Sequence, residues 1–229
     1  MRNLKECANK LCLVVLLFLA VEKGHGQKLE HGIKIHLGGM SSIVNLKGTV
    51  FSAYNQESLG KAEKLLLGQN VSIGYFWRRL DLVFNNALQQ SVRSAESKHL
   101  DFSYRSYGIT GGYSIPLNFT LLNELRPYVG LDIIYDSEVL FTDTHFGSLD
   151  SMKFGGKSVK FSSTDKSYYI PVGLSAVKYL GDAKYWNINA WLQMAIPTNP
   201  KLNPIFKASQ FLSFGVGVSR RLYVGNRQN

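Results

Sequence analysis

Seven charged or titratable side chains occupy matching positions in strand-like segments of this chain. They are Lys34, His36, Arg79, Asp81, Asp132, Asp136 and Arg221. Such a set could line an interior and select a solute or gate a pore. It could equally fill a narrow interior, because buried charges must pair with one another to offset the cost of burial. Which of the two applies depends on the fold that positions them.

Two further pairs of residues could support catalysis. His99 with Asp101, and His145 with Asp143, each place an imidazole near a carboxylate, as a rim-site hydrolase or acyltransferase would need. No nucleophile elbow, phosphate-binding loop, zinc-ligand spacing or dinucleotide fingerprint accompanies them. We therefore expect a protein that is not an enzyme and that uses no cofactor and no metal.

The elements that position these residues repeat with a period of two. Between Trp186 and Ile196 the even positions are apolar, and from Leu212 to Val218 they are apolar again. The residues between them are small or uncharged: Ser213, Gly215, Gly217 and Ser219 in the last segment. A period of two is a strand pattern. Eight such segments are present, at about 29–39, 71–77, 80–88, 106–115, 128–136, 168–176, 186–196 and 212–219.

The connections between these segments alternate between long and short. The longest are 40–66 and 142–165, and the shortest are the turns at Arg78-Arg79 and Gly181-Asp182. Short turns on one side and long loops on the other, with an even number of strands, are typical of outer-membrane barrels. Both termini would then lie on the periplasmic side.

Alternation alone does not say which face of the strands points inward. A soluble, lipocalin-like barrel has an apolar interior and a charged exterior. Here the second face is mostly Gly, Ser, Asn and Tyr, which suits the crowded interior of an eight-stranded barrel. The sequence therefore predicts an all-β fold, an eight-stranded antiparallel up-and-down transmembrane β-barrel with its apolar face toward lipid. Because the interior of such a barrel is narrow, we expect the seven-residue network to occupy the lumen with paired charges and to conduct little.

The N-terminus has the pattern of a secretory signal. A basic start precedes an apolar run at 11–21, and Gly24-His25-Gly26 offers a cleavage site. We expect a signal peptide at 1–26 and the barrel domain at 27–229. Both cysteines, Cys7 and Cys12, lie in the removable part, so the mature domain has no thiol chemistry.

The chain carries a net charge of +10, and removing 1–26 takes away four basic and two acidic residues, leaving +8. The Lys and Arg residues are scattered among loops and strand ends. We expect no nucleic-acid binding, and outer-membrane lipid as the partner.

Three stretches carry a family resemblance: the start of the mature chain at Gln27-Lys28, the segment Arg126-Pro127-Tyr128-Val129-Gly130-Leu131, and the glycine-rich 211–219. With them the chain resembles the small eight-stranded outer-membrane barrels of Gram-negative bacteria, especially the Bacteroidetes-type outer membrane protein beta-barrel families. The resemblance covers nearly all of the mature chain and implies location in the cell outer membrane. One departure is that Tyr223 is followed by six more residues, where such proteins often end on an aromatic residue.

These observations predict a non-enzymatic outer-membrane protein that acts through extracellular loops or as a structural part of the envelope. An extracellular or envelope partner would bind at 40–66 and 142–165, because loops on a rigid scaffold carry function. Two alternatives remain open. One is a narrow, porin-like channel or small-ligand-binding barrel that uses the lumen charges, and the other is a rim-site hydrolase or acyltransferase.

Overall fold

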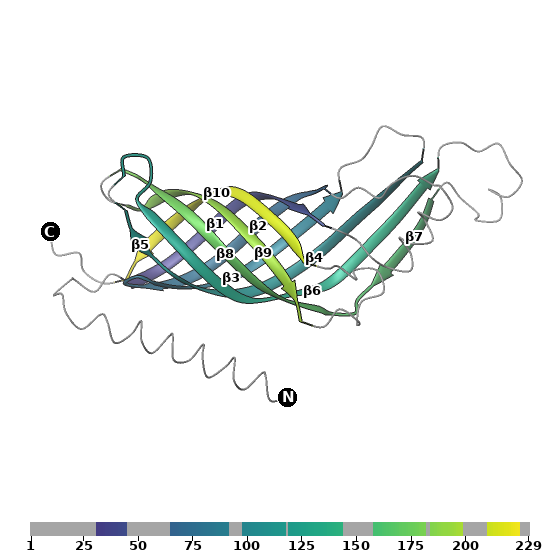
Figure 1. Ribbon diagram of the computed structural model, residues 1–229, viewed down its shortest axis with the longest axis horizontal. Coiled ribbons are helices and arrows are strands. Elements are labelled where there is room, and N and C mark those ends of the chain that lie inside the picture. Colours follow the sequence, from purple (N-terminus) through teal and green to yellow (C-terminus); the bar gives the residue numbers. More distant parts are fainter. Residues whose placement is uncertain are drawn as a thin grey trace, which may run out of the picture.

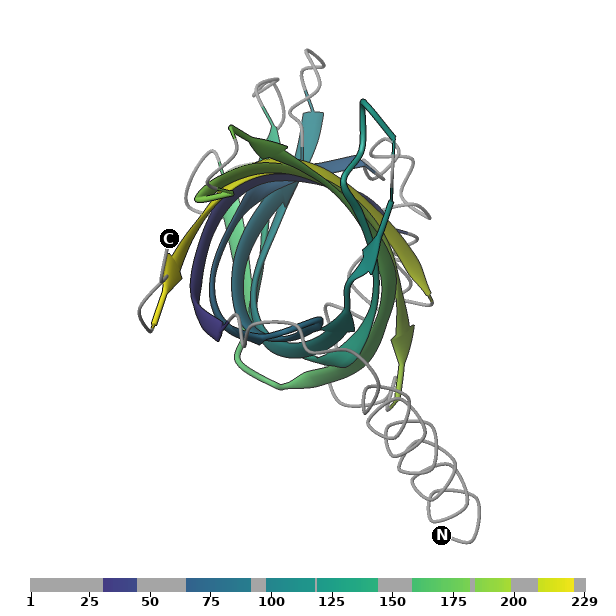
Figure 2. The same ribbon diagram turned by 90° about the vertical axis from the view of Figure 1, so that its left-hand side faces the viewer.

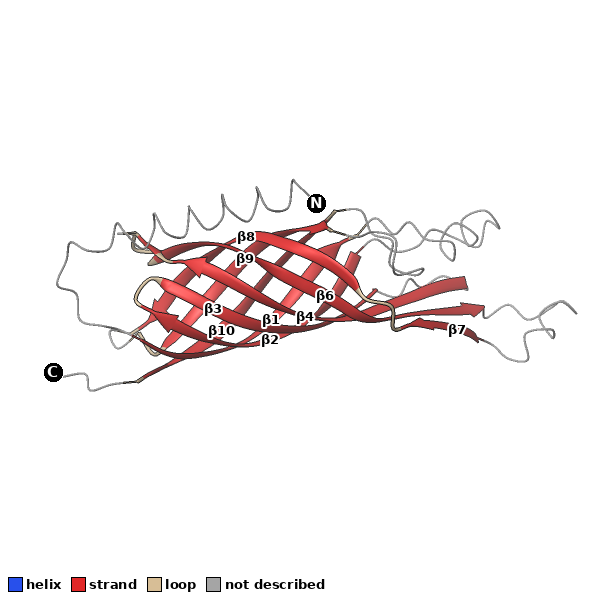
Figure 3. Cartoon of the chain, turned by 90° about the horizontal axis from the view of Figure 1, so that it is seen from below, coloured by secondary structure: helices blue, strands red, loops and turns tan. Residues whose placement is uncertain are grey.

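The computed structural model describes residues 31–44, 65–91, 98–117, 119–143, 158–181, 184–198 and 210–224. The expected signal peptide at 1–26 lies outside these ranges. Every regular element in them is a strand, as Figure 3 shows. The strands are β1 (His31–Ile43), β2 (Leu65–Trp77), β3 (Leu80–Ser91), β4 (Lys98–Tyr113), β5 (Ile115–Pro116), β6 (Glu124–Asp143), β7 (Ser158–Ser163), β8 (Ser167–Leu180), β9 (Trp186–Pro197) and β10 (Phe211–Tyr223).

Eight of these strands form a closed antiparallel barrel. The order is β4-β3-β2-β1-β10-β9-β8-β6, and pairing of β4 with β6 completes the ring, which Figure 2 shows along its axis. The first and last barrel strands pair along all but one residue of each, from Gly32–Tyr223 to Ile43–Leu212. The predicted eight-stranded up-and-down barrel is confirmed. Within the described ranges, no helix has the length and hydropathy needed to cross a membrane.

The two ends of the barrel differ in their connections (Figure 1). At one end, here called the turn end, β1 begins, β10 ends, and the connections between β2 and β3, β4 and β6, and β8 and β9 are short. The other end, here called the loop end, has the connections between β1 and β2, β3 and β4, β6 and β8, and β9 and β10, and all of these except the one between β3 and β4 are longer. At the tight turn before β3, Arg78 has a φ of 52°, and Gly181 after β8 has a φ of 75°. Left-handed backbone of this kind is typical of short hairpin connections.

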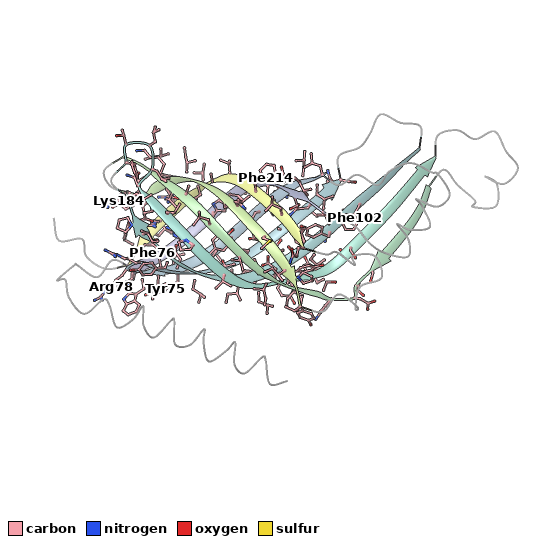
Figure 4. All side chains as sticks on the ribbon, in the orientation of Figure 1. Tyr75, Phe76, Arg78, Phe102, Lys184 and Phe214 are labelled. Carbon is pink, nitrogen blue, oxygen red and sulfur yellow. The ribbon has the colours of Figure 1, made fainter. Side chains whose placement is uncertain are left out.

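The apolar face of the strands points outward. In β10, Leu212, Val216 and Val218 are 40%, 59% and 43% exposed, whereas Ser213 is 0% exposed and Ser219 1%. The same alternation runs around the ring, so that aliphatic and aromatic side chains cover the outside (Figure 4). A soluble protein rarely exposes an apolar surface that extends this far. The predicted orientation, with small and polar residues inside, is confirmed.

Glycines on the inner face make room for large lumen side chains. A Cβ on Gly215 would lie 2.2 Å from the Trp191 ring, and one on Gly217 would lie 2.4 Å from the His36 ring. A Cβ on Gly108 would lie 1.8 Å from a carboxylate oxygen of Asp132. The glycines of the last strand therefore leave space for two particular lumen side chains, Trp191 and His36.

Two irregularities interrupt the barrel ladder. The register between β4 and β6 shifts between Arg105 and Ser106, so Tyr135 of β6 forms a β-bulge. The ladder between β6 and β8 is also interrupted, because it pairs Val129 with Val172 and then resumes only at Asp132. Pro171 lies in this gap and has no backbone N–H to donate.

The strands at the loop end are longer than the sequence pattern predicts. Residues 40–43 belong to β1 and 65–66 to β2, so the predicted loop 40–66 is too long at both ends. The predicted loop 142–165 is wrong in part, because it contains the end of β6 and all of β7. Residues 44–64 and 144–157, apart from Val44, lie outside the described ranges.

Three strands continue past the barrel wall at the loop end (Figures 1 and 3). There β4 pairs with β6 from Ser103–Glu138 to Lys98–Asp143, and β6 pairs with β7 from Ser137–Ser163 to Thr142–Ser158. We call residues 98–103, 137–143 and 158–163 the protruding sheet.

Candidate functional site

A group of charged side chains fills the lumen at the turn end. This charged cluster comprises Lys34, Asp81, Glu124, Arg126 and Arg221. Asp81 accepts from Lys34 Nζ at 3.2 Å and from Arg126 Nε at 2.7 Å. Glu124 accepts from Arg126 at 2.8 Å and from Arg221 at 3.4 Å. The residues come from β1, β3, β6 and β10, so the ion pairs connect strands across the barrel.

Polar and aromatic neighbours complete the charged cluster. Arg126 also donates to Ser114 Oγ at 2.9 Å, and the Tyr179 hydroxyl donates to Glu124. The Arg221 guanidinium lies 5.0 Å from the centre of the Phe76 ring and 4.9 Å from that of Tyr179. Lys34, Asp81 and Arg126 are almost fully buried. Each charge therefore has an opposite partner, which offsets the cost of burying it.

A neutral network occupies the middle of the lumen. The Asn189 amide donates to Ser219 Oγ at 2.6 Å, and Ser219 Oγ lies 2.9 Å from His36 Nδ1. The His36 ring meets the edge of Trp191, with ring centres 5.2 Å apart. Among the described residues no carboxylate is hydrogen-bonded to the His36 imidazole to orient it, and Ser219 is buried. The geometry favours a packing role over nucleophilic catalysis.

Asp132 lies apart from the charged cluster. Its carboxylate accepts from Gln193 Nε2 at 3.3 Å, and Gln193 in turn accepts from the Tyr128 hydroxyl at 3.2 Å. Within the described part of the chain, no lysine or arginine lies within 4.0 Å of this carboxylate.

Aromatic rings narrow the lumen at the loop end. Tyr169 and Phe211 have ring centres 5.2 Å apart, and Tyr104 lies 6.4 Å from Phe211. Phe102 adjoins Tyr104 at 6.0 Å. We call these four residues the aromatic cluster. Below it, Ser42 and Ser213 share a hydrogen bond of 2.6 Å. In Figure 4, Phe102 lies toward the loop end and Phe76 toward the turn end.

A cavity of about 120 Å³ extends from the charged cluster to the aromatic cluster, and members of both clusters line it. All eight barrel strands contribute to its lining, which includes His36, Asp132, Asn189 and Trp191. The lumen therefore holds a polar cavity between two groups of large side chains.

The structure brings some of the seven predicted lumen residues together and separates others. Lys34, Asp81 and Arg221 belong to the charged cluster, whereas His36 and Asp132 line the cavity without joining it. Arg79 lies at the turn before β3, where it donates to the Tyr113 hydroxyl at 3.4 Å.

The prediction for Asp136 is wrong. Asp136 pairs with Arg105 at 3.9 Å, and these side chains are 37% and 59% exposed. The cause is the bulge at Tyr135, which inserts one residue into β6. The side chains beyond the bulge therefore point to the opposite side of the barrel wall from the one that the sequence alternation predicts. After the bulge, Ser137 is the buried residue.

Sequence reasoning missed Glu124, Arg126 and Tyr179. Arg126 lies two positions before Tyr128, so extending the alternation backward would have placed Arg126 and Glu124 on the lumen face. Pro127 lies between Arg126 and Tyr128, and a proline weakens a strand assignment because it has no backbone N–H to donate. Arg126 holds both carboxylates of the charged cluster.

The rim-enzyme alternative gains no support from the described residues. The backbone of His99 and Asp101 lies in β4, but their side chains, and His145 entirely, are outside what the structure describes. Among the described residues, no three His, Cys, Asp or Glu side chains are grouped to hold a metal ion.

Comparison with known proteins finds similarity in fold. No protein family profile matches the chain, and no curated protein does. Neisserial surface protein A is 15% identical, with a TM-score of 0.50 over 83% of this chain and 97% of that one. Ail, the attachment invasion locus protein of Yersinia pestis, is 18% identical, with a TM-score of 0.46 over 86% of this chain and 100% of that one. The outer membrane protein OprG from Pseudomonas aeruginosa is 13% identical, with a TM-score of 0.40 over 85% of this chain and 98% of that one. The chain thus has the fold of the small eight-stranded outer-membrane barrels.

Proposed function

We propose that this chain is a non-enzymatic barrel of the Gram-negative outer membrane that binds an extended segment of a partner protein along the edges of its protruding sheet. The observation that carries this proposal is the sheet itself. Strand β6 is 20 residues long and continues well beyond its last pair with β8, Ile134–Ser167. The pairs between β6 and β8 that form the barrel wall end before this extension.

The two outer edges of the protruding sheet offer backbone hydrogen-bonding groups. The ladder between β3 and β4 ends at Gln90–Ser103, where Ser91 Oγ accepts from the Phe102 amide at 2.7 Å. Beyond that point β4 has β6 as its only strand partner in the described ranges, and β7 likewise pairs only with β6 there. Unpaired strand edges are templates for adding a further strand.

Membrane location follows from the outer surface of the barrel. Exposed side chains such as Leu37, Leu82 and Val216 form an apolar belt that lipid would cover. Exposed Tyr75, Trp77 and Trp186 lie near the turn end of the belt, where aromatic residues meet headgroups. The turn end would face the periplasm and the protruding sheet the outside.

The filled lumen argues against the channel alternative. The charged cluster and the aromatic cluster occupy its two ends, and an eight-stranded barrel has little interior space beyond what side chains fill. The finer assignment to the Bacteroidetes-type families rests on the three stretches named above, and it remains a prediction.

The test compares peptide binding by the full chain with that of a variant lacking the protruding hairpin. Replacing residues 139–161 with Asn-Gly joins Glu138 to Ser162, which already face each other as strand partners. Extended peptides selected from a random library on cells displaying the full chain should lose binding to this variant. They should also lose binding when their own backbone amides are N-methylated, because strand addition uses those groups.

The matched control shortens the other predicted binding segment, replacing 45–64 with a short glycine-rich linker between β1 and β2. Peptide binding should survive in this variant. Equal binding by the 139–161 variant, or binding indifferent to N-methylation, would overturn the proposal.

A further inference from the structure

The cavity in the lumen contains hydrogen-bond acceptors that have no donor. This feature lies apart from the protruding sheet and does not depend on the proposed binding of a partner there. Its volume of about 120 Å³ is well above the roughly 10–15 Å³ that one water molecule needs, so a small organic ion fits together with water. It lies inside the barrel, between the charged cluster and the aromatic cluster.

Asp132 places a carboxylate in this cavity without a cationic partner. Gln193 donates to it at 3.3 Å, and the described residues supply no ion pair. Lys34, Arg126 and Arg221 all pair with Asp81 or Glu124 instead. This half-buried carboxylate with a single neutral donor has unused capacity, because an ionised carboxylate can accept about four hydrogen bonds.

Neutral acceptors in the same cavity are unused as well. Gln89 Oε1 and Asn189 Oδ1 have no hydrogen-bond partner, and these residues are only 1% and 6% exposed. Asn70 Oδ1 is a third such oxygen. The orientation of the Asn189 amide follows from its nitrogen, which donates to Ser219 Oγ at 2.6 Å. Buried acceptors without donors are costly, so a donor-rich ligand would be stabilised here.

The chemistry of the lining favours an ammonium group over a metal ion. Asp132 is the one carboxylate in the cavity outside the charged cluster, and no metal-binding group of His, Cys, Asp and Glu is present among the described residues. An alkylammonium ion offers three N–H donors and one positive charge. The rings of Trp191 and Tyr128, which also line the cavity, attract such cations.

We propose that the lumen cavity binds a small primary amine in its protonated form, with Asp132 as its counter-ion. The amide oxygens of Gln89 and Asn189 accept hydrogen bonds from the ammonium group or from water beside it. Gly108 is part of the site because it leaves the space that the Asp132 carboxylate occupies.

The test uses methylammonium chloride as the probe and Trp191 as the reporter. The chain has three tryptophans, and Trp77 and Trp186 lie on the outer surface, so a Trp77→Phe, Trp186→Phe background isolates the signal of Trp191. The complete barrel is refolded in detergent at about pH 8, where an ordinary aspartate is ionised. Refolding with the probe present removes any dependence on an entry route.

Methylammonium should change the Trp191 fluorescence saturably, and Asp132→Asn should weaken its binding by at least about tenfold. Asp136→Asn is the matched control, since Asp136 lies on the same strand but faces outward, and it should bind as the parent does. Heat-dependent gel mobility confirms that each variant is folded.

Three results would overturn the proposal. They are no saturable response in the parent, an unchanged affinity in Asp132→Asn, or the same response to potassium chloride at equal concentration, which would indicate a site without ammonium selectivity.

Discussion

Asp81 forms ion pairs with Lys34 and Arg126 in the charged cluster, so replacing its carboxylate should lower the free energy of unfolding. In Asp81→Asn, Lys34 loses its carboxylate partner while it stays buried. Removing one partner of a buried pair costs about 3–5 kcal/mol, because it leaves an uncompensated charge. We expect a fall of about that size in the free energy of unfolding, measured by urea titration of the refolded barrel in lipid vesicles.

The control for this prediction is Asp136→Asn. The Arg105–Asp136 pair is exposed, and exposed pairs contribute only about 0–1 kcal/mol. If Asp81→Asn and Asp136→Asn lowered the free energy of unfolding equally, the buried ion pairs of the charged cluster would not stabilise the barrel as described here.

Gly215 should be intolerant of a side chain. A Cβ there would overlap the Trp191 ring at 2.2 Å and the Gly39 carbonyl oxygen at 2.6 Å. Overpacking of this kind costs about 1–3 kcal/mol. Gly39→Ala is the matched substitution, because nothing lies within 4 Å of a Cβ at that position. Urea titration should show a clear loss of stability for Gly215→Ala and little change for Gly39→Ala, and the reverse order would contradict the packing described here.

The sequence predicts the facing of most lumen residues, because a period of two allows only two faces. Lys34, Asp81 and Arg221 were placed correctly on this basis. Asp136 was not, since no glycine or proline marks the bulge at Tyr135. The sequence also could not predict that Asp132 has no Lys or Arg partner among the described residues. That depends on the register between neighbouring strands, which sets which side chains meet across the lumen.

At the scale of elements, the protruding hairpin should be separable from the barrel. The wall closes through pairs up to Ile134–Ser167 between β6 and β8, and these do not involve 139–161. The variant in which Asn-Gly replaces 139–161 should therefore refold and keep its heat-dependent gel mobility. A variant that migrates identically with and without boiling would show that the extension is needed for closure.

The same elements show what the sequence could not predict. Within the membrane, lipid on one side and a polar lumen on the other impose a strict alternation. Outside the barrel wall a strand does not have lipid on one face and the lumen on the other, so the alternation is weaker, and the sequence of 142–165 resembles a loop rich in Ser and Gly. Strand β7 was therefore missed although β8 and β10 were found.

At the scale of the whole molecule, the filled lumen should not conduct. Planar-bilayer recordings of the purified barrel should show no steady single-channel steps. Steady steps abolished by Asp132→Asn would contradict this account and favour the channel alternative.

The central claim is that the apolar face of every barrel strand points to lipid. Both cysteines precede residue 27, so in a chain expressed from residue 27 onward a single introduced cysteine can carry a nitroxide label without interference. Labels on β10 at Phe214, Val216 and Val218 should be accessible to lipid-soluble oxygen, and labels at Ser213 and Ser219 should not. Oxygen access at the serine positions, with labels at Val216 and Val218 shielded from lipid, would contradict the orientation on which the whole account depends.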